Sequence, residues 1–166
     1  MLTLSLRQLE GQHLSEPEYT PTQLAPIRGK ALALLAQRDH SVFELRTKLL
    51  QRGYAVTEIA PILEEFCAEN WLNDARFAAT YVRIYQNKGA GPKKVSYLLN
   101  NLGVSKEIIA LAIQQVERDW LEIAKQVAEK KIGNLDKMTR QQAYRLGQFL
   151  AQRGFEWEMI RQIIND

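Results

Sequence analysis

The sequence predicts an all-α protein built from three tandem three-helix repeats that form an elongated, curved array. Apolar residues recur at spacings of three and four along nearly the whole chain after residue 21, as they do on helices. No stretch alternates apolar and polar residues between turn dipeptides, so strands are not expected. One residue pattern also recurs about every 50 residues, which indicates repeated structural units.

The repeat is clearest when the chain is aligned on Gly53, Gly103 and Gly154. Apolar residues lie eight and four positions before each glycine, and again six and ten positions after it. These residues are Leu45, Leu49, Ile59 and Leu63 in the first copy, Val95, Leu99, Ile109 and Ile113 in the second, and Leu146, Leu150, Ile160 and Ile164 in the third. A unit of this size buries little apolar surface alone, so neighbouring units must pack in a row.

The first repeat is expected at residues 21–70, after an N-terminal arm at 1–20. Its first helix runs from about 22 to 37. Ser41 and Glu44 form a capping box for the second helix, and Gly53 ends that helix in a left-handed conformation. Thr57 is the expected cap of the third helix, and Pro61 favours a start nearer residue 60.

The second repeat is expected at residues 71–118. Asn73 or Asp74 caps its first helix, which extends to about Lys88. Pro92 suits the first position of the next helix. Gly103 ends that helix, and Ser105 caps the last helix of the repeat.

The third repeat is expected at residues 119–166. Its helices are predicted from Asp119 to Lys131, from about Thr139 to Gly154, and from Glu156 to Ile164. Gly133 and Asn134 separate the first two of them.

Composition excludes several classes of protein. The 166 residues contain one cysteine, Cys67, so no internal disulfide forms and a reducing cytoplasmic location is expected. No run of about 18 apolar residues exists, and the start lacks the features of a signal peptide, so no membrane association is expected. Cys67 and Trp71 are expected in the core. No catalytic, metal-binding or cofactor-binding constellation is present, so an enzyme is the least favoured interpretation.

The net charge of +3 conceals segregated charges. Residues 76–106 contain six basic and no acidic residues, residues 137–153 four basic and none acidic, and residues 57–75 five acidic and none basic. Lys93 and Lys94 stand in the predicted first helical turn after the connector Lys88-Gly89-Ala90-Gly91-Pro92, where the helix dipole disfavours cations by a few tenths to about 1 kcal/mol. This cost favours an anionic or acidic partner, with a solvated basic face as the alternative.

Several stretches resemble the RecX family, regulators of the RecA recombinase. The first is Arg38-Asp39-His40-Ser41-x2-Glu44-Leu45-Arg46-x-Lys48-Leu49, and the next is Trp71-Leu72-Asn73-Asp74-x-Arg76-Phe77-Ala78. The others are Lys88-Gly89-Ala90-Gly91-Pro92-x-Lys94-Val95 and Phe149-Leu150-x2-Arg153-Gly154-Phe155. The resemblance covers residues 28–166.

The resemblance implies a cytoplasmic, non-enzymatic protein that lodges in the groove of the RecA–DNA filament. Such a protein inhibits ATP hydrolysis, strand exchange and coprotease activity, and so modulates recombination, DNA repair and the SOS response. Ala90 replaces the family's usual aromatic residue, and Tyr85 and Asn87 stand where further basic residues are common. Binding to single- and double-stranded DNA is therefore expected to be weak or to depend on the filament, and the chain is expected to be monomeric.

The expected filament-binding residues centre on the basic connector. Lys88, Lys93 and Lys94 are the central contacts, with Arg83 on the preceding helix. Arg46 and Arg52 in the first repeat, and Arg145 and Arg153 in the third, could extend the surface, although Arg52 and Arg153 equally suit helix C-termini. The alternatives are a DNA-binding module of the helix-turn-helix type and a scaffold for another protein. Apolar and acidic helices after the glycines argue against insertion into the major groove.

Overall fold

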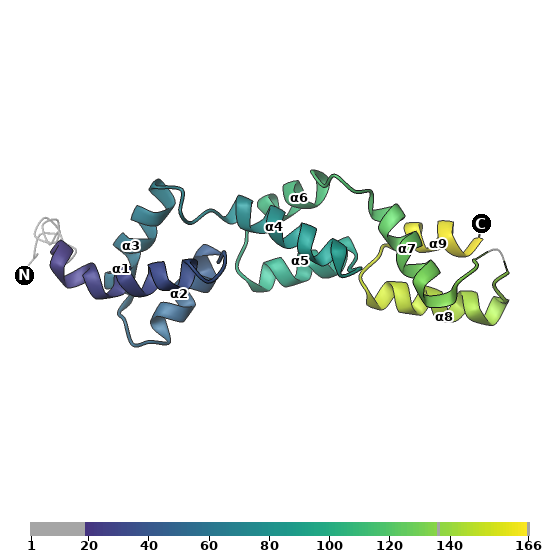
Figure 1. Ribbon diagram of the computed structural model, residues 1–166, viewed down its shortest axis with the longest axis horizontal. Helices are drawn as coiled ribbons and strands as arrows, with labels where there is room; N and C mark the ends of the chain where they lie inside the picture. The colour runs from purple at the N-terminus through teal and green to yellow at the C-terminus, as the bar shows by residue number, and fades with distance from the viewer. Residues whose placement is uncertain (1–18, 136, 166) are drawn as a thin grey trace, which may run out of the picture.

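The computed structural model describes residues 19–135 and 137–165, and these form nine α-helices and no strand. They make three successive three-helix units along the long axis of the molecule (Figure 1). Unit 1 contains α1 (Pro21–Leu35), α2 (Val42–Leu50) and α3 (Val56–Ala68). Unit 2 contains α4 (Asp74–Asn87), α5 (Pro92–Asn101) and α6 (Lys106–Gln114). Unit 3 contains α7 (Trp120–Ile132), α8 (Arg140–Gln152) and α9 (Trp157–Asn165). The predicted all-α array of three tandem repeats is confirmed.

The repeat pattern forms the hydrophobic core. The six residues before the glycines are at most 1 % exposed, and so are Ile59 and Ile160 after them. Unit 1 has a core of its own, whereas one continuous core runs through units 2 and 3. Helices pack mainly against the other two helices of their own unit. The joints between units are therefore made by loops and helix ends.

Most helix ends follow the sequence signals. Ser41, Asn73, Ser105, Asp119 and Thr139 each accept a backbone N–H in the first turn of the following helix. Gly53, Gly103 and Gly154 end α2, α5 and α8 with φ of +87°, +74° and +87°. Residues 1–18 of the predicted arm lie outside the described residues, while Thr20 caps α1.

The capping box predicted for Ser41 and Glu44 and the cap predicted at Thr57 were wrong. The Ser41 hydroxyl accepts a hydrogen bond from the Glu44 amide. The Glu44 carboxylate, however, accepts hydrogen bonds from Arg38 and not from the Ser41 amide. Helix α3 begins at Val56, before Thr57, because the Glu58 carboxylate accepts the amide of Ala55 at 2.7 Å. Pro61 then lies inside α3, where its ring removes only one hydrogen bond, to the carbonyl of the exposed residue Thr57.

Two predicted core residues lie at the surface. Cys67 is exposed, and the Trp71 side chain, 42 % exposed, lies over the edge of the core. Trp71 packs its ring 5.3 Å from that of Phe66, and the Arg28 guanidinium lies 5.5 Å from the Trp71 ring centre. Cys67 lies near the end of α3 outside its buried face, and Trp71 lies in the loop between α3 and α4, where helical spacing does not apply.

The second helices of the three units meet end to end. At the first joint, the N-cap of α2 meets the C-terminal end of α5: the Ser41 hydroxyl donates to the Leu102 carbonyl at 2.5 Å. At the second joint, the N-terminal end of α5 meets the C-terminal end of α8. There the Gly91 amide donates to the Arg153 carbonyl at 2.8 Å, and the Lys93 amide donates to the Gly154 carbonyl at 3.0 Å. At this second joint, backbone amides at the start of α5 that have no partner within their helix donate to carbonyls at the end of α8 that also have none.

The three aligned glycines differ in what lies around them. A Cβ on Gly53 would meet nothing within 4 Å, whereas one on Gly103 would overlap the Phe43 side chain. A Cβ on Gly154 would come closer than 3.0 Å to the backbone of Lys94. The lack of a side chain at Gly53 therefore only allows its helix to end in the left-handed conformation, whereas at Gly154 it also allows the close contact with α5.

We expect alanine substitutions to destabilise in the order Gly53, Gly103, Gly154. Gly53→Ala costs about 1–2 kcal/mol, the penalty of a left-handed conformation for a residue with a Cβ. Gly154→Ala costs at least about 2 kcal/mol more, because the rigid backbone of Lys94 cannot yield as the Phe43 side chain can. Urea unfolding followed by circular dichroism measures this order. Equal losses for Gly53→Ala and Gly154→Ala would contradict the joint described here.

Candidate functional site

The basic connector between α4 and α5 forms the second joint. A Cβ on Gly91 would overlap the backbone of Gly154 and Phe155, so the two loops touch through their main chains. Gly89 has φ of +70°, and a Cβ there would overlap the Val127 side chain. Pro92 is the first residue of α5 and is buried. The glycines of the connector are therefore explained by close packing of units 2 and 3.

The lysines of the connector point away from this packing. Lys93 and Lys94 occupy the second and third positions of α5, their side chains are exposed, and the first turn contains no acidic residue. Lys88 is the C-cap of α4, and its Nζ lies 4.8 Å from the ring centre of Tyr85. Tyr85 stacks on Tyr81 with 4.5 Å between ring centres. The connector thus places three cations on a backbone held by unit 3.

The structure groups only some of the predicted residues. Lys88 and Arg153 line one cavity between units 2 and 3, while Lys93 lines a second cavity with Lys106. Arg83 is exposed on α4 beside a third. Lys94 is exposed beside Lys93, and the remaining three are exposed on units 1 and 3: Arg46, Arg52 and Arg145.

Two of the predicted arginines are bound within the protein. The Arg52 guanidinium donates to the Lys48 carbonyl at 2.6 Å and so closes the end of its own helix. The Arg153 guanidinium donates to the carbonyls of Lys88 and Gly89 at 2.8 and 3.3 Å and so closes the end of α4 in the neighbouring unit. The stabilisation of its own helix end that the sequence suggested is therefore present at Arg52, whereas Arg153 stabilises the end of a different helix.

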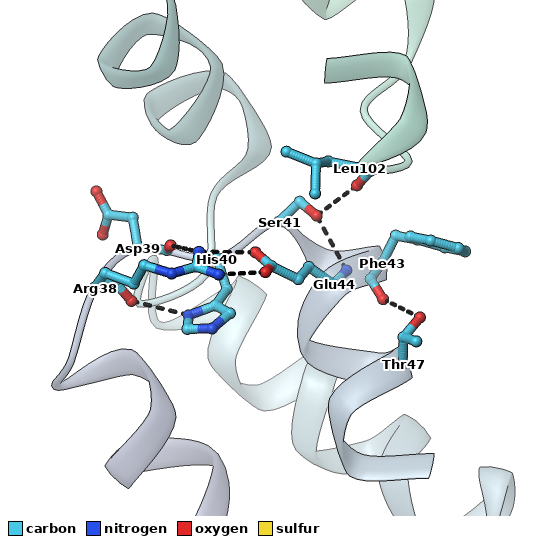
Figure 2. Close-up of polar contacts among 8 residues, drawn as sticks. All are labelled: Arg38, Asp39, His40, Ser41, Phe43, Glu44, Thr47 and Leu102. Carbon is cyan, nitrogen blue, oxygen red and sulfur yellow. Dashed lines mark hydrogen bonds and ion pairs between the residues drawn. The ribbon is translucent and has the colours of Figure 1, made fainter. Parts of the chain in front are cut away.

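The first joint is a polar network around the start of α2 (Figure 2). Arg38 donates from both terminal nitrogens to the two carboxylate oxygens of Glu44. The Val42 amide donates to Asp74 Oδ1 at 2.9 Å, which connects α2 to the start of α4. This joint was not foreseen, because the sequence stretch that contains it signals only a helix cap.

His40 is buried in this network, at 3 % exposure. Its Nδ1 lies 2.9 Å from the Arg38 carbonyl oxygen. Burial, together with the charges of Arg38 and Lys48, lowers the pKa of His40 from the ordinary value of 6.5. Burial works to raise the pKa of Glu44, but the hydrogen bonds and charge of Arg38 outweigh it and hold that pKa below 4.5.

These shifts predict that acid weakens the protein in two steps. The unfolded chain takes up a proton on His40 below about pH 6.5 while the folded chain still resists it, so stability falls as the pH falls from there through the folded pKa. Glu44 adds a second loss below about pH 4.5. The slope attributable to one group is at most about 1.4 kcal/mol per pH unit.

The His40→Gln variant isolates the first step. We expect its free energy of unfolding to change less than that of the unaltered protein between about pH 7.5 and 5.5. Urea unfolding at the two pH values makes the comparison. An equally steep loss in His40→Gln would mean that other groups cause it.

The cavity that Lys88 and Arg153 line is also lined by three cations that the sequence did not indicate: Arg118, Lys130 and Lys131. Arg118 stands between Glu117 and Asp119, so local charge gave no signal. Lys130 and Lys131 lie in the last turn of α7, where cations suit any helix end.

Among the described residues, no cluster of three or more His, Cys, Asp or Glu side chains could hold a metal ion. Nor does any described helix have the length and hydropathy needed to cross a membrane.

Comparisons with known proteins assign the three units to one family. Three family models match the chain: "RecX, first three-helix domain" at residues 28–66, the second such domain at 73–113, and the third at 117–164. The curated regulatory protein RecX of Halorhodospira halophila is 36 % identical over 135 residues, which cover 81 % of this chain and 84 % of that protein. The regulatory protein RecX of Vibrio vulnificus is 34 % identical over 149 residues, or 89 % of this chain and 96 % of that protein.

A solved structure has the same fold. The crystal structure of RecX from Lactobacillus salivarius superposes with a TM-score of 0.76 at 24 % identity, over 86 % of this chain and 94 % of that one.

Proposed function

Because this chain belongs to the RecX family of regulatory proteins, we propose that it binds the RecA–DNA filament and inhibits ATP hydrolysis, strand exchange and coprotease activity. On this proposal it modulates recombination, DNA repair and the SOS response from the cytoplasm, where the filament forms. It acts as a monomer, without a cofactor and without catalysis of its own. Its contact with single- or double-stranded DNA is weak or made within the filament.

The exposed basic start of α5 is the observation that carries this proposal. Lys93 and Lys94 lie at a helix N-terminus, where cations are unfavourable by a few tenths to about 1 kcal/mol. No described acidic side chain within 4.0 Å neutralises them. An acidic protein surface or a nucleic-acid backbone docked on them would supply the missing charge.

The shape of the molecule supports the same function. The three units lie in a row along the long axis of the molecule (Figure 1). An array of this kind can follow the groove of a helical filament and contact several successive subunits. On this proposal Arg83, Lys88, Lys93 and Lys94 form the centre of the surface, and Arg46, Arg52 and Arg145 extend it. Arg153 contributes by holding the connector.

Inhibition of DNA-stimulated ATP hydrolysis by a RecA filament tests the proposed function. We expect inhibition when the protein is added at substoichiometric ratios to RecA, because one array spans several subunits. Absence of inhibition at every ratio would refute the proposal. Strong sequence preference in direct DNA binding would instead favour a helix-turn-helix module.

Charge reversal at the start of α5 tests the site. We expect Lys93→Glu/Lys94→Glu to weaken inhibition about tenfold, since two lost charge contacts of about 0.7 kcal/mol each amount to about 1.4 kcal/mol. The control Lys30→Glu/Lys137→Glu makes the same charge change at exposed lysines outside the surface. Circular dichroism checks that both variants fold. Unchanged inhibition by Lys93→Glu/Lys94→Glu would remove these residues from the site.

A further inference from the structure

A basic cavity of about 500 Å³ lies between units 2 and 3. It is bounded by the end of α4, by α7 and by the end of α8, and five of its twelve lining residues are cations: Lys88, Arg118, Lys130, Lys131 and Arg153. No acidic residue lines it. None of the five makes an ion pair with any described side chain.

Arg118 is positioned at this cavity by contacts from two helices. Its backbone carbonyl accepts a hydrogen bond from Nε2 of the buried residue Gln86 at 3.2 Å. Its guanidinium donates to Asn87 Oδ1 at 3.2 Å and to Gln126 Oε1 at 2.8 Å. A guanidinium has five N–H donors, so those beyond these two bonds remain available to a ligand.

Arg153, which also lines the cavity, is held in a similar way. One terminal nitrogen binds the Lys88 and Gly89 carbonyls, and the guanidinium carbon lies 5.1 Å from the ring centre of Phe149. Lys131 Nζ lies 5.1 Å from the same ring. Neutral oxygens and an aromatic face thus orient these cations without neutralising their charge.

The negative partial charges of the helix ends around the cavity offset only part of this positive charge. The C-terminal ends of α4, α7 and α8 all meet the cavity, and each carries about half a negative charge. Three such ends offset about one and a half of the five positive charges, so a clear excess remains. Stabilisation of helix ends therefore does not explain Arg118, which lies in the loop before α7.

We propose that this cavity is a binding site for phosphate groups. Oriented guanidinium groups bind phosphate oxygens through paired hydrogen bonds, and lysines at the rim add charge. The volume admits a pyrophosphate or two linked backbone phosphates. Phosphate binding is inferred from the cavity alone. The further inference that the phosphates belong to a nucleic acid rests on the proposed function.

Titration of the full-length protein with pyrophosphate tests the site. Nitrogen–proton correlation spectra at fixed ionic strength should show saturable shifts at the amides of Asn87, Lys88 and Gly89 and at the Arg118 Nε–H. Shifts that never saturate, or that spread over all exposed lysines, would overturn the proposal. A short oligothymidylate and ATP are titrated in parallel: tighter binding of the oligonucleotide identifies a backbone phosphate as the source, and tighter binding of ATP identifies a free nucleotide.

Two variants separate the site from general positive charge. Lys130→Gln/Lys131→Gln removes two exposed charges at the rim and should weaken pyrophosphate binding at least fivefold. Arg118→Lys keeps the charge but removes the planar fork, and should weaken it about as much. The matched control, Lys30→Gln/Lys137→Gln, should leave binding within twofold. Equal weakening in the control and the rim variant would overturn the proposal.

The outcome is independent of the filament assay. Absence of pyrophosphate binding together with intact inhibition of RecA would refute only the phosphate site. Saturable pyrophosphate binding together with no inhibition would refute only the proposed function.

Discussion

The structure depends on the end-to-end contact of α8, α5 and α2. At each joint the last carbonyls of one second helix face the first donors of another, so groups that a helix cannot satisfy internally are satisfied by the neighbouring unit. The facing ends also carry opposite partial charges, which favours their alignment. Because helices otherwise pack mainly within their own units, these few contacts, together with the core shared by units 2 and 3, determine how the units follow one another. Gly53, at the free end of the row, confirms the pattern by having nothing within 4 Å of its missing Cβ.

The helices and the core could be predicted from the sequence because both depend on local pattern. Apolar spacing around the three glycines identified twelve residues of which all but Ile113 and Ile164 are buried, and Ser105, Asp119 and Thr139 marked helix starts where they were expected. The joints could not be predicted, because the partner of Ser41 is 61 residues away and the glycines of the connector look like ordinary turn residues. Cys67 shows the same limit, since helical periodicity gives a direction but the edge of the core depends on what packs there, and Trp71 lies in a loop that periodicity does not describe.

The candidate site shows how one residue type can serve two purposes. Arg52 and Arg153 occupy equivalent positions before aligned glycines, yet the first closes its own helix and the second closes a helix of the neighbouring unit. Lys93 and Lys94 do neither, and their charges remain exposed at an unfavourable helix end. The sequence indicated where positive charge is concentrated. Only the structure separates the cations that hold the units together from those that face outward, and it adds Arg118 from a segment of mixed charge.

The two joints differ in how amino-acid replacement can alter them. The second joint is made mainly by main-chain hydrogen bonds, from Gly91 to Arg153 and from Lys93 to Gly154, so replacing side chains other than Arg153 changes it little as long as the glycines stay. The first joint is made by the side chains of Ser41, Phe43 and Asp74, so replacement of any one of them removes a contact of the joint. Unit 1 has a separate core as well, so a new angle at its joint leaves the packing of units 2 and 3 intact. Related proteins can therefore diverge in reach and curvature through the N-terminal unit while the C-terminal pair stays fixed.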